Sequence, residues 1–168
     1  MYSTGKHHAE IVVKNYGKIE LELDADVAPI TVENFANLVN EGFYNGLTFH
    51  RIISGFMIQG GDPLGNGTGG SSKTIKGEFA SNGVKNSISH VRGTISMARS
   101  SMPNSASSQF FIVHQDSTFL DGQYAAFGTV TSGMDVVDKI CEDTVVEDNN
   151  GTVAAKNQPI IEKITMID

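Results

Sequence analysis

The sequence predicts a single domain made mainly of β-strands, arranged as a barrel or a sandwich, with two helices. Its 168 residues suit one domain with one buried core, and its 18 glycines indicate many turns. Short runs in which apolar and polar residues alternate recur along the chain and are separated by turn residues. No repeat or linker interrupts this pattern, so we expect one domain over 1–168, with residues 1–9 as a flexible leader.

Eight segments have the composition of strands. In the first two, residues 11–13 and 18–23, apolar residues alternate with charged ones on either side of the turn Asn15-Tyr16-Gly17, which predicts a hairpin. The other six segments are residues 48–53, 56–59, 94–98, 109–114, 125–130 and 160–167.

Two segments show the spacing of an amphipathic helix. The first follows Pro29 and ends before Gly42, a plausible stop. Its apolar residues on one side are Val32, Phe35, Ala36 and Val39. The second is expected to start at Ser132 or Gly133. Its apolar residues on one side are Met134, Val137, Ile140 and Cys141.

Composition excludes several classes of protein. With 12 Lys+Arg against 19 Asp+Glu, the formal net charge is -7, which disfavours binding to nucleic acid phosphates. Cys141 is the only cysteine, so no internal disulfide can form, and its apolar neighbours favour a buried packing role. No stretch resembles a signal peptide or approaches the ~20 apolar residues of a membrane span. We expect a cytoplasmic protein that binds no membrane.

The most informative segment runs from Phe49 to Asp62. Strand alternation predicts that Arg51 shares a face with Phe49 and Ile53, and that His50 points to the opposite face as a structural residue. A guanidinium in an apolar row is costly unless it is paired or used. In residues 105–113 the same alternation predicts that Gln109 and Phe111 face one side, and in residues 119–128 two apolar residues precede a turn.

Three sequence blocks, F-H-R-I-I-S-G-F-M-I-Q-G-G-D, S-S-Q-F-F-I and L-D-G-Q-Y-A-A-F-G, together resemble the signature blocks of the cyclophilins, the peptidyl-prolyl cis/trans isomerases of that type. The resemblance runs from about Ile11 to the C-terminus and is closest to compact bacterial members. It implies a closed eight-stranded antiparallel β-barrel capped by two α-helices, which agrees with the strands and helices expected above.

The resemblance also implies the site residues. It assigns catalysis to Arg51, with Gln59 beside it. It assigns substrate binding to Phe56, Met57, Ala98, Arg99, Ser100, Gln109, Phe111, Phe119, Leu120 and Tyr124. Its implied substrates are X-Pro bonds in proline-containing peptides and in unfolded or flexible protein segments, where the activity assists folding. We expect a monomer.

The sequence departs from the best-known eukaryotic pattern at three places. Phe119 stands where those members have tryptophan, and Tyr124 where they have histidine. Residues 99–104 form a loop one residue longer than their M-A-N loop. The first departure predicts that the inhibitor cyclosporin binds only weakly.

The chemistry implied by the resemblance needs no metal and no cofactor, because rotation about an X-Pro bond breaks no covalent bond. The catalyst must bind the twisted amide better than either planar form. On twisting, the proline nitrogen becomes a hydrogen-bond acceptor, and a guanidinium, which stays charged and offers fixed N–H groups, suits the role of donor.

Three other readings compete with this one. The spacing G-x-G-x-x-G in Gly65 to Gly70 resembles a dinucleotide loop, but no helix pattern follows it, so a mobile surface loop is expected. Three histidines, His50, His90 and His114, would suit a hydrolase, yet no serine or cysteine lies in a nucleophile motif. The remaining alternative is a binding module for proline peptides without turnover, which the presence of Arg51 disfavours.

Overall fold

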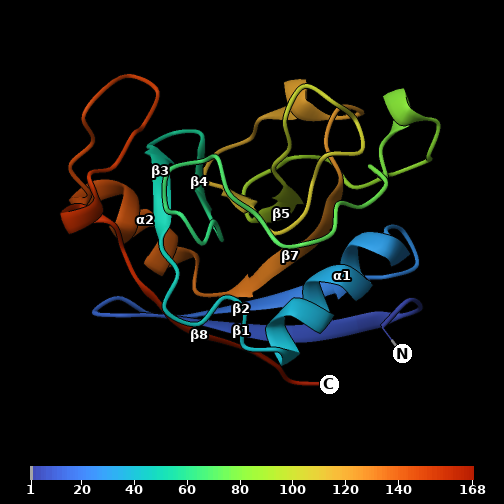
Figure 1. Ribbon diagram of the computed structural model, residues 1–168, viewed down its shortest axis with the longest axis horizontal. Coiled ribbons are helices and arrows are strands. Elements are labelled where there is room, and N and C mark those ends of the chain that lie inside the picture. The colour runs from blue at the N-terminus through green and yellow to red at the C-terminus, as the bar shows by residue number, and fades with distance from the viewer. Residues whose placement is uncertain (1) are drawn as a thin grey trace.

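The computed structural model describes residues 2–168 and is mainly β (Figure 1). Its strands are β1 (Lys6–Val13), β2 (Gly17–Asp24), β3 (Phe49–Ile53), β4 (Met57–Gly60), β5 (Thr94–Met97), β6 (Phe110–Val113), β7 (Ala126–Ser132) and β8 (Ile161–Met166). Its α-helices are α1 (Pro29–Asn40) and α2 (Met134–Asp143), and short 3₁₀ turns lie at Ala80–Asn82, Thr118–Leu120 and Ala155–Asn157. The expected strands and helices are therefore all present, with bounds that differ by a few residues.

The strands form one antiparallel sheet in the order β3-β4-β6-β5-β7-β2-β1-β8. The predicted closed barrel is wrong: the sheet is an open half-barrel, because no ladder joins β3 to β8 at its two ends. Only isolated bridges cross this gap within residues 2–168, between Thr48 and Ile160 and between Arg51 and Thr152. The strands β3 and β8 meet at their starts alone, and the chain before β8 occupies the rest of the opening.

The first strand begins earlier than the sequence pattern indicates. Lys6 pairs with Asp24 of β2, and Ala9 pairs with both β2 and β8. Four residues of the predicted flexible leader therefore belong to the sheet, while Met1 lies outside the described residues. The side chains at the start of β1 are polar, so the sequence shows no apolar alternation there. His8 is partly exposed, and its Nδ1 lies 2.8 Å from the Oδ2 of Asp168.

The main core lies between the sheet and the two helices α1 and α2. Phe35 of α1 is fully buried, and its ring centroid lies 5.3 Å from Tyr44, 5.7 Å from Phe110 and 5.3 Å from Phe127. Each large apolar side chain buried in this way contributes roughly 1.5 to 3 kcal/mol. Burial also raises the pKa of the Cys141 thiol to about 12, which agrees with a packing role for this residue on α2.

In residues 2–168, no helix combines the length and apolar character needed to cross a bilayer.

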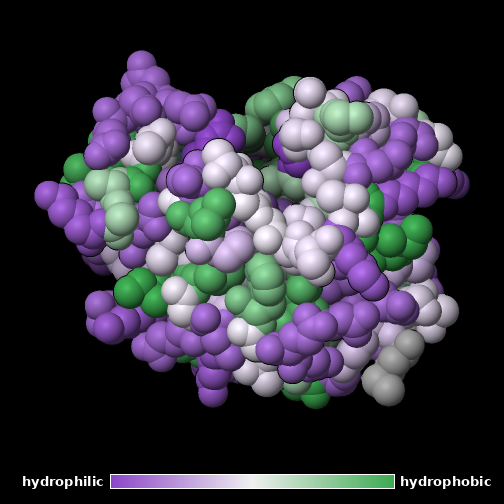
Figure 2. Space-filling view, viewed as in Figure 1, coloured by the Kyte–Doolittle hydropathy of each residue, from purple (hydrophilic) through white to green (hydrophobic). Residues whose placement is uncertain are grey.

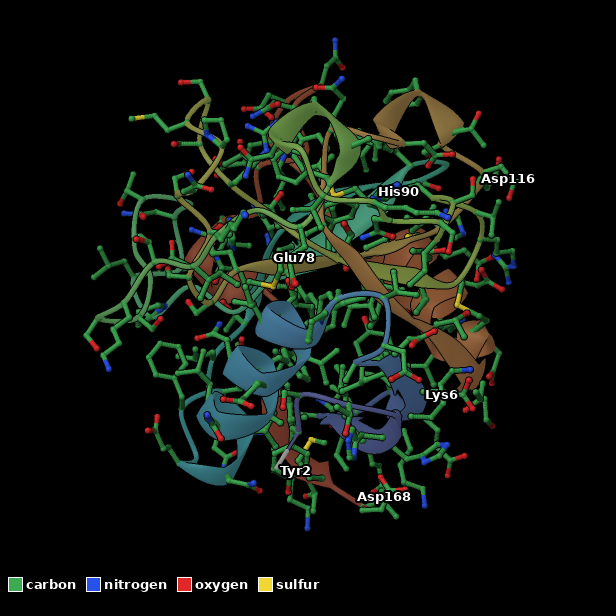
Figure 3. The ribbon with its side chains drawn as sticks, turned by 90° about the vertical axis from the view of Figure 1, so that its right-hand side faces the viewer. Tyr2, Lys6, Glu78, His90, Asp116 and Asp168 are labelled. Atoms are coloured by element: carbon green, nitrogen blue, oxygen red, sulfur yellow. The ribbon has the colours of Figure 1, made fainter. Side chains whose placement is uncertain are left out.

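The N-terminus of α1 is capped from a distant loop. Ala28 at the cap position supplies no side-chain acceptor. Instead, the buried carboxylate of Glu78, which Figure 3 shows above the end of the helix, accepts hydrogen bonds from the N–H of Thr31 at 2.7 Å and of Ile30 at 3.3 Å. The hydroxyl of Thr31 donates a third bond at 2.7 Å. A carboxylate suits this place because it satisfies free N–H groups and complements the helix dipole.

Candidate active site

A second apolar cluster lies apart from the main core. Its buried members are Met57, Phe111, Val113 and Leu120, and Ile53, Phe56, Ala98 and Tyr124 pack against it. Along β6, Phe111 and Val113 face this cluster, while Phe110 and Ile112 face the main core, so the two pairs lie on opposite faces as alternation predicts. Neighbouring strands β3, β4 and β6 thus supply the floor of a small apolar site.

A cavity of about 130 Å³ opens over this cluster, and a second hollow of about 240 Å³ adjoins it. The residues that line the first are Arg51, Phe56, Met57, Gln59, Ala98, Arg99, Phe111, Leu120 and Tyr124. Of the other predicted residues, Ser100 and Gln109 line the second hollow. Phe119 lines neither: its side chain is 72% exposed at the rim, with its ring 5.6 Å from that of Phe56.

Arg51 lines the cavity from β3. The prediction that it shares a face with both Phe49 and Ile53 is wrong for Phe49. Phe49 packs in the main core, whereas Ile53 packs against the cavity cluster. The pairing of β3 with β4 shifts register between Phe49 and Arg51, and this irregularity breaks the simple alternation. The register shift lets Arg51 leave the core side without burying its charge.

The guanidinium of Arg51 is held by uncharged acceptors. Its Nε donates to the main-chain oxygen of Asn150 at 2.9 Å and its Nη2 donates to the Oδ1 of Asn150 at 3.1 Å. Its Nη1 donates to the Oε1 of Gln59 at 3.3 Å. A guanidinium has five N–H groups, so each terminal nitrogen keeps one N–H that makes no bond within residues 2–168.

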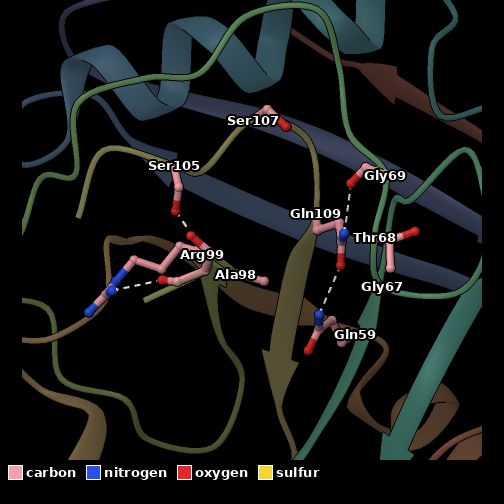
Figure 4. A pocket seen from close by; sticks show the side chains of 10 residues that line it. Gln59, Gly67, Thr68, Gly69, Ala98, Arg99, Ser105, Ser107 and Gln109 are labelled. Carbon is pink, nitrogen blue, oxygen red and sulfur yellow. Dashed lines mark hydrogen bonds between the residues drawn. The ribbon is translucent and has the colours of Figure 1, made fainter. Parts of the chain in front are cut away.

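A relay of amides extends from Arg51 into the second hollow, and Figure 4 shows the part that begins at Gln59. The Nε2 of Gln59 donates to the Oε1 of Gln109 at 3.0 Å, and the Nε2 of Gln109 donates to the main-chain oxygen of Gly69 at 2.8 Å. Each amide therefore fixes the orientation of the next. Gln109 acts mainly as support, since both ends of its amide have partners.

The glycine-rich loop after β4 is tied to Asp62 and forms part of the site. The carboxylate of Asp62 accepts hydrogen bonds from the N–H groups of Leu64 at 2.8 Å and Gly67 at 2.6 Å. Burial tends to raise the pKa of Asp62, but these bonds outweigh it and hold that pKa below its usual range. No helix begins directly after Gly70, so the interpretation of this segment as a dinucleotide loop is wrong. The contacts with Asp62 favour a fixed loop over the expected mobile one.

Arg99 lines both hollows, as Gln59 and Ala98 also do. Its guanidinium carbon lies 4.8 Å from the ring centroids of Phe79 and Tyr124, and its Nη2 donates to the oxygen of Gln123 at 2.7 Å. Figure 4 shows this side chain directed away from the hollow. The main-chain N–H of Arg99 has no partner among residues 2–168 and remains available to a ligand.

Three histidines lie near the site, in structural positions. His90 stacks beneath Phe111, with ring centroids 5.9 Å apart, and its Nδ1 donates to Asp121 at 2.9 Å. Burial lowers the pKa of His90, although Asp121 opposes the shift. Burial likewise lowers the pKa of His50, and the Nδ1 of His114 accepts a bond from the N–H of Gly55 at 2.8 Å. Within the described part of the chain, no three His, Cys, Asp or Glu side chains gather as a metal site.

Sequence reasoning missed several residues of the site. Those in the second hollow are Gly67, Thr68, Gly69, Ser105 and Ser107. The others are Asn150, which holds Arg51, and Phe79 and Gln123, which hold Arg99. The glycine run and the turn sequence D-N-N-G-T at 148–152 were local signals of loops, but neither indicates the strand against which its loop packs.

Comparisons with known proteins agree with this geometry. Residues 8–166 match the family described as cyclophilin type peptidyl-prolyl cis-trans isomerase/CLD. A peptidyl-prolyl cis-trans isomerase of Helicobacter pylori is 48% identical over 135 residues, which cover 79% of this chain and 80% of that protein. Peptidyl-prolyl cis-trans isomerase B of Bacillus subtilis is 44% identical over 137 residues, which cover 82% of this chain and 92% of that protein.

A solved structure extends the likeness to the whole fold. The crystal structure of a Cryptosporidium parvum cyclophilin type peptidyl-prolyl cis-trans isomerase in the presence of the dipeptide Ala-Pro matches with a TM-score of 0.83 and 32% identity. The match covers 96% of this chain and 99% of that chain. The fold and site define an isomerase of proline peptide bonds. The chain belongs to the cyclophilin-type peptidyl-prolyl cis-trans isomerase family.

Proposed function

We propose that the protein catalyses cis/trans isomerisation of X-Pro bonds by seating the proline ring in the 130 Å³ cavity and donating a hydrogen bond from Arg51 to the proline nitrogen. One observation carries this proposal. A fixed guanidinium, with N–H groups that make no bond within residues 2–168, borders a small cavity that has an apolar floor. The ring requires an apolar slot, and the nitrogen requires a donor at its edge.

The proposed donor acts only in the transition state. Resonance in the planar amide withdraws the nitrogen lone pair and sets a barrier of roughly 18 to 20 kcal/mol. As the bond twists, the nitrogen becomes pyramidal and can accept a hydrogen bond that neither planar isomer accepts. Arg51 then binds the twisted form better than the substrate, which is the condition for catalysis.

The other site residues divide between the ring and the peptide chain. Met57, Phe111 and Leu120 are buried in the floor and contact the ring in this proposal. Gln59 orients Arg51 through its Oε1. The unpaired N–H of Arg99 is placed to donate to a carbonyl of the substrate chain. The bond rotation requires no metal and no cofactor.

Proline-containing peptides are the substrates that this site suits, and the Cryptosporidium relative was crystallised in the presence of one, Ala-Pro. Unfolded or flexible protein segments present the same chemistry. We propose that residues 1–168 act as a single isomerase domain and that the protein is a monomer. In support, hydrophilic side chains cover much of the face that Figure 2 shows. The cytoplasmic location stays a prediction.

The test separates an enzyme from a binding module. Exchange between the cis and trans resonances of a short Ala-Pro peptide is measured by NMR with substoichiometric protein. An enzyme increases the exchange rate in proportion to its concentration. Shifted peptide resonances with an unchanged exchange rate would instead show binding without turnover.

A further inference from the structure

Asn150 is the residue that holds the proposed hydrogen-bond donor in place. We propose that it is a positioning residue for the isomerase reaction, which acts through Arg51 and does not touch the substrate. This inference rests on the function proposed for Arg51. It concerns a loop residue outside the three sequence blocks that indicated the family.

Asn150 accepts two hydrogen bonds from the guanidinium of Arg51. The main-chain oxygen of Asn150 accepts from Nε of Arg51 at 2.9 Å, and its side-chain Oδ1 accepts from Nη2 at 3.1 Å. These two N–H groups lie on one edge of the guanidinium, so a single residue fixes that edge in the manner of a bidentate acceptor. Gln59 contacts the opposite terminal nitrogen at 3.3 Å. Contacts on both sides leave the planar group little freedom to rotate.

The loop that carries Asn150 is itself held firmly. The Oδ1 of Asp148 accepts from the N–H of Asn150 at 3.0 Å and of Thr152 at 3.1 Å. Gly151 has a φ of +80°, which favours glycine, and a Cβ there would lie 2.5 Å from the main-chain oxygen of Ile52. The loop therefore passes so close to β3 that no larger residue fits at 151.

The same loop is bonded to β3 on both sides of Arg51. The N–H of Ile52 donates to the oxygen of Gly151 at 2.9 Å, and the N–H of Val153 donates to the oxygen of His50 at 3.1 Å. The main chain of Arg51 and the acceptors for its guanidinium thus belong to one rigid unit. A donor that is fixed before the substrate arrives pays no ordering cost during the reaction.

The acceptors at Asn150 are also chemically suited to the task, because they are uncharged. No carboxylate lies in ion-pair contact with Arg51 within residues 2–168. Amide and main-chain oxygens orient a guanidinium without neutralising it. The positive charge therefore stays available for the proline nitrogen, whereas a carboxylate would compete for it.

The test is a double-mutant cycle between Arg51→Ala and Asn150→Ala, with kcat and KM measured separately on an Ala-Pro peptide. Asn149→Ala is the matched control, since its side chain is exposed and makes no hydrogen bond within the described residues. We expect Asn150→Ala to lower kcat/KM by about 5- to 50-fold, mainly through kcat. Its unfolding midpoint should equal that of the control, Asn149→Ala. In the Arg51→Ala background, Asn150→Ala should cause no further loss.

An equal loss in both backgrounds would overturn the inference, because Asn150 would then act independently of Arg51. A second measurement uses the wild type and so does not depend on whether a variant folds. In ¹⁵N NMR the Arg51 guanidinium should show slowed rotation, with separate signals for its two Nη atoms. Averaged Nη signals would contradict the inference. If wild-type activity or its dependence on Arg51 fails, the proposed function fails. If both hold while Asn150→Ala matches Asn149→Ala, only this inference fails.

Discussion

At the scale of single residues, the partners of an arginine decide its role. Arg92 forms a bidentate ion pair with Asp138, with both distances at 2.7 Å, and this pair lowers the pKa of Asp138. Its charge is therefore engaged in linking α2 to the loop before β5. Arg51 has neutral partners among residues 2–168 and keeps N–H groups without a partner there, beside a cavity that has an apolar floor. Only in the second arrangement does a guanidinium that no carboxylate neutralises present N–H groups to a cavity.

The exposed rim residue Phe119 leads to a prediction about cyclosporin. Phe119→Trp adds an indole N–H at a position that is 72% exposed beside Phe56, where a cyclic peptide can accept it. One added hydrogen bond is worth on the order of 1 kcal/mol, so inhibition should tighten about 5-fold while turnover changes less. Inhibition constants are compared with those of Phe119→Leu, which adds no donor. Equal inhibition of wild type and Phe119→Trp would show that this position does not set the affinity.

His50 leads to a prediction about acid stability. Burial lowers the pKa of His50; the charge of Asp62 opposes this shift, and that of Arg51 adds to it. Neither ring nitrogen of His50 has a hydrogen-bond partner among residues 2–168. Because the folded pKa lies below the unfolded value of about 6.5, the unfolded state binds the proton first as pH falls. Stability present above about pH 7 is then lost on acidification, at up to about 1.4 kcal/mol per pH unit.

Urea unfolding at pH 7, 6 and 5 tests this. The unfolding free energy of His50→Leu should fall less steeply with decreasing pH than that of the wild type. The remaining fall comes in part from His90, whose pKa is also lowered by burial. Turnover of the folded protein should stay flat between about pH 6 and 9, since no proton is transferred. Identical slopes in the two proteins would contradict the role given to His50.

At the scale of elements, the start of α1 depends on a side chain from another segment. Glu78→Gln keeps an acceptor for Thr31 but removes the charge at the helix N-terminus. We expect it to lower the free energy of unfolding by about 1 to 2 kcal/mol, because the carboxylate is buried and makes charge-assisted bonds. Asp135→Asn in the exposed first turn of α2 is the control and should cost only a few tenths of a kcal/mol. Equal losses in urea unfolding would show that the cap contributes little.

Local patterns predicted those elements whose pairing is regular. Alternation in β6 correctly predicted that Phe111 and Phe110 lie on opposite faces, and the structure places Phe111 on the cavity side and Phe110 in the core. The same rule misplaced Phe49, because a register shift in β3 is set by pairing with β4 rather than by local sequence. It also overlooked the start of β1, whose polar residues do not resemble a strand.

At the scale of the molecule, contacts between distant segments were the part that sequence reasoning could not supply. The sequence blocks identified Arg51 and most of the cavity residues. They did not indicate that Asn150, 99 residues away, holds Arg51. Nor did they predict an open sheet whose gap is bridged by the chain before β8. Such contacts depend on how loops pack across the fold, and local periodicity carries no information about them.

The most direct test of the central claim is the exchange rate of an Ala-Pro peptide with wild type and with Arg51→Ala, measured alongside thermal unfolding of both. Removing one electrostatic donor typically costs ~2 to 4 kcal/mol in the transition state, so the variant should be about 30- to 1000-fold slower. Its unfolding midpoint should change little, because Arg51 contacts only neutral groups at the surface. A folded Arg51→Ala protein with full wild-type activity would contradict the account.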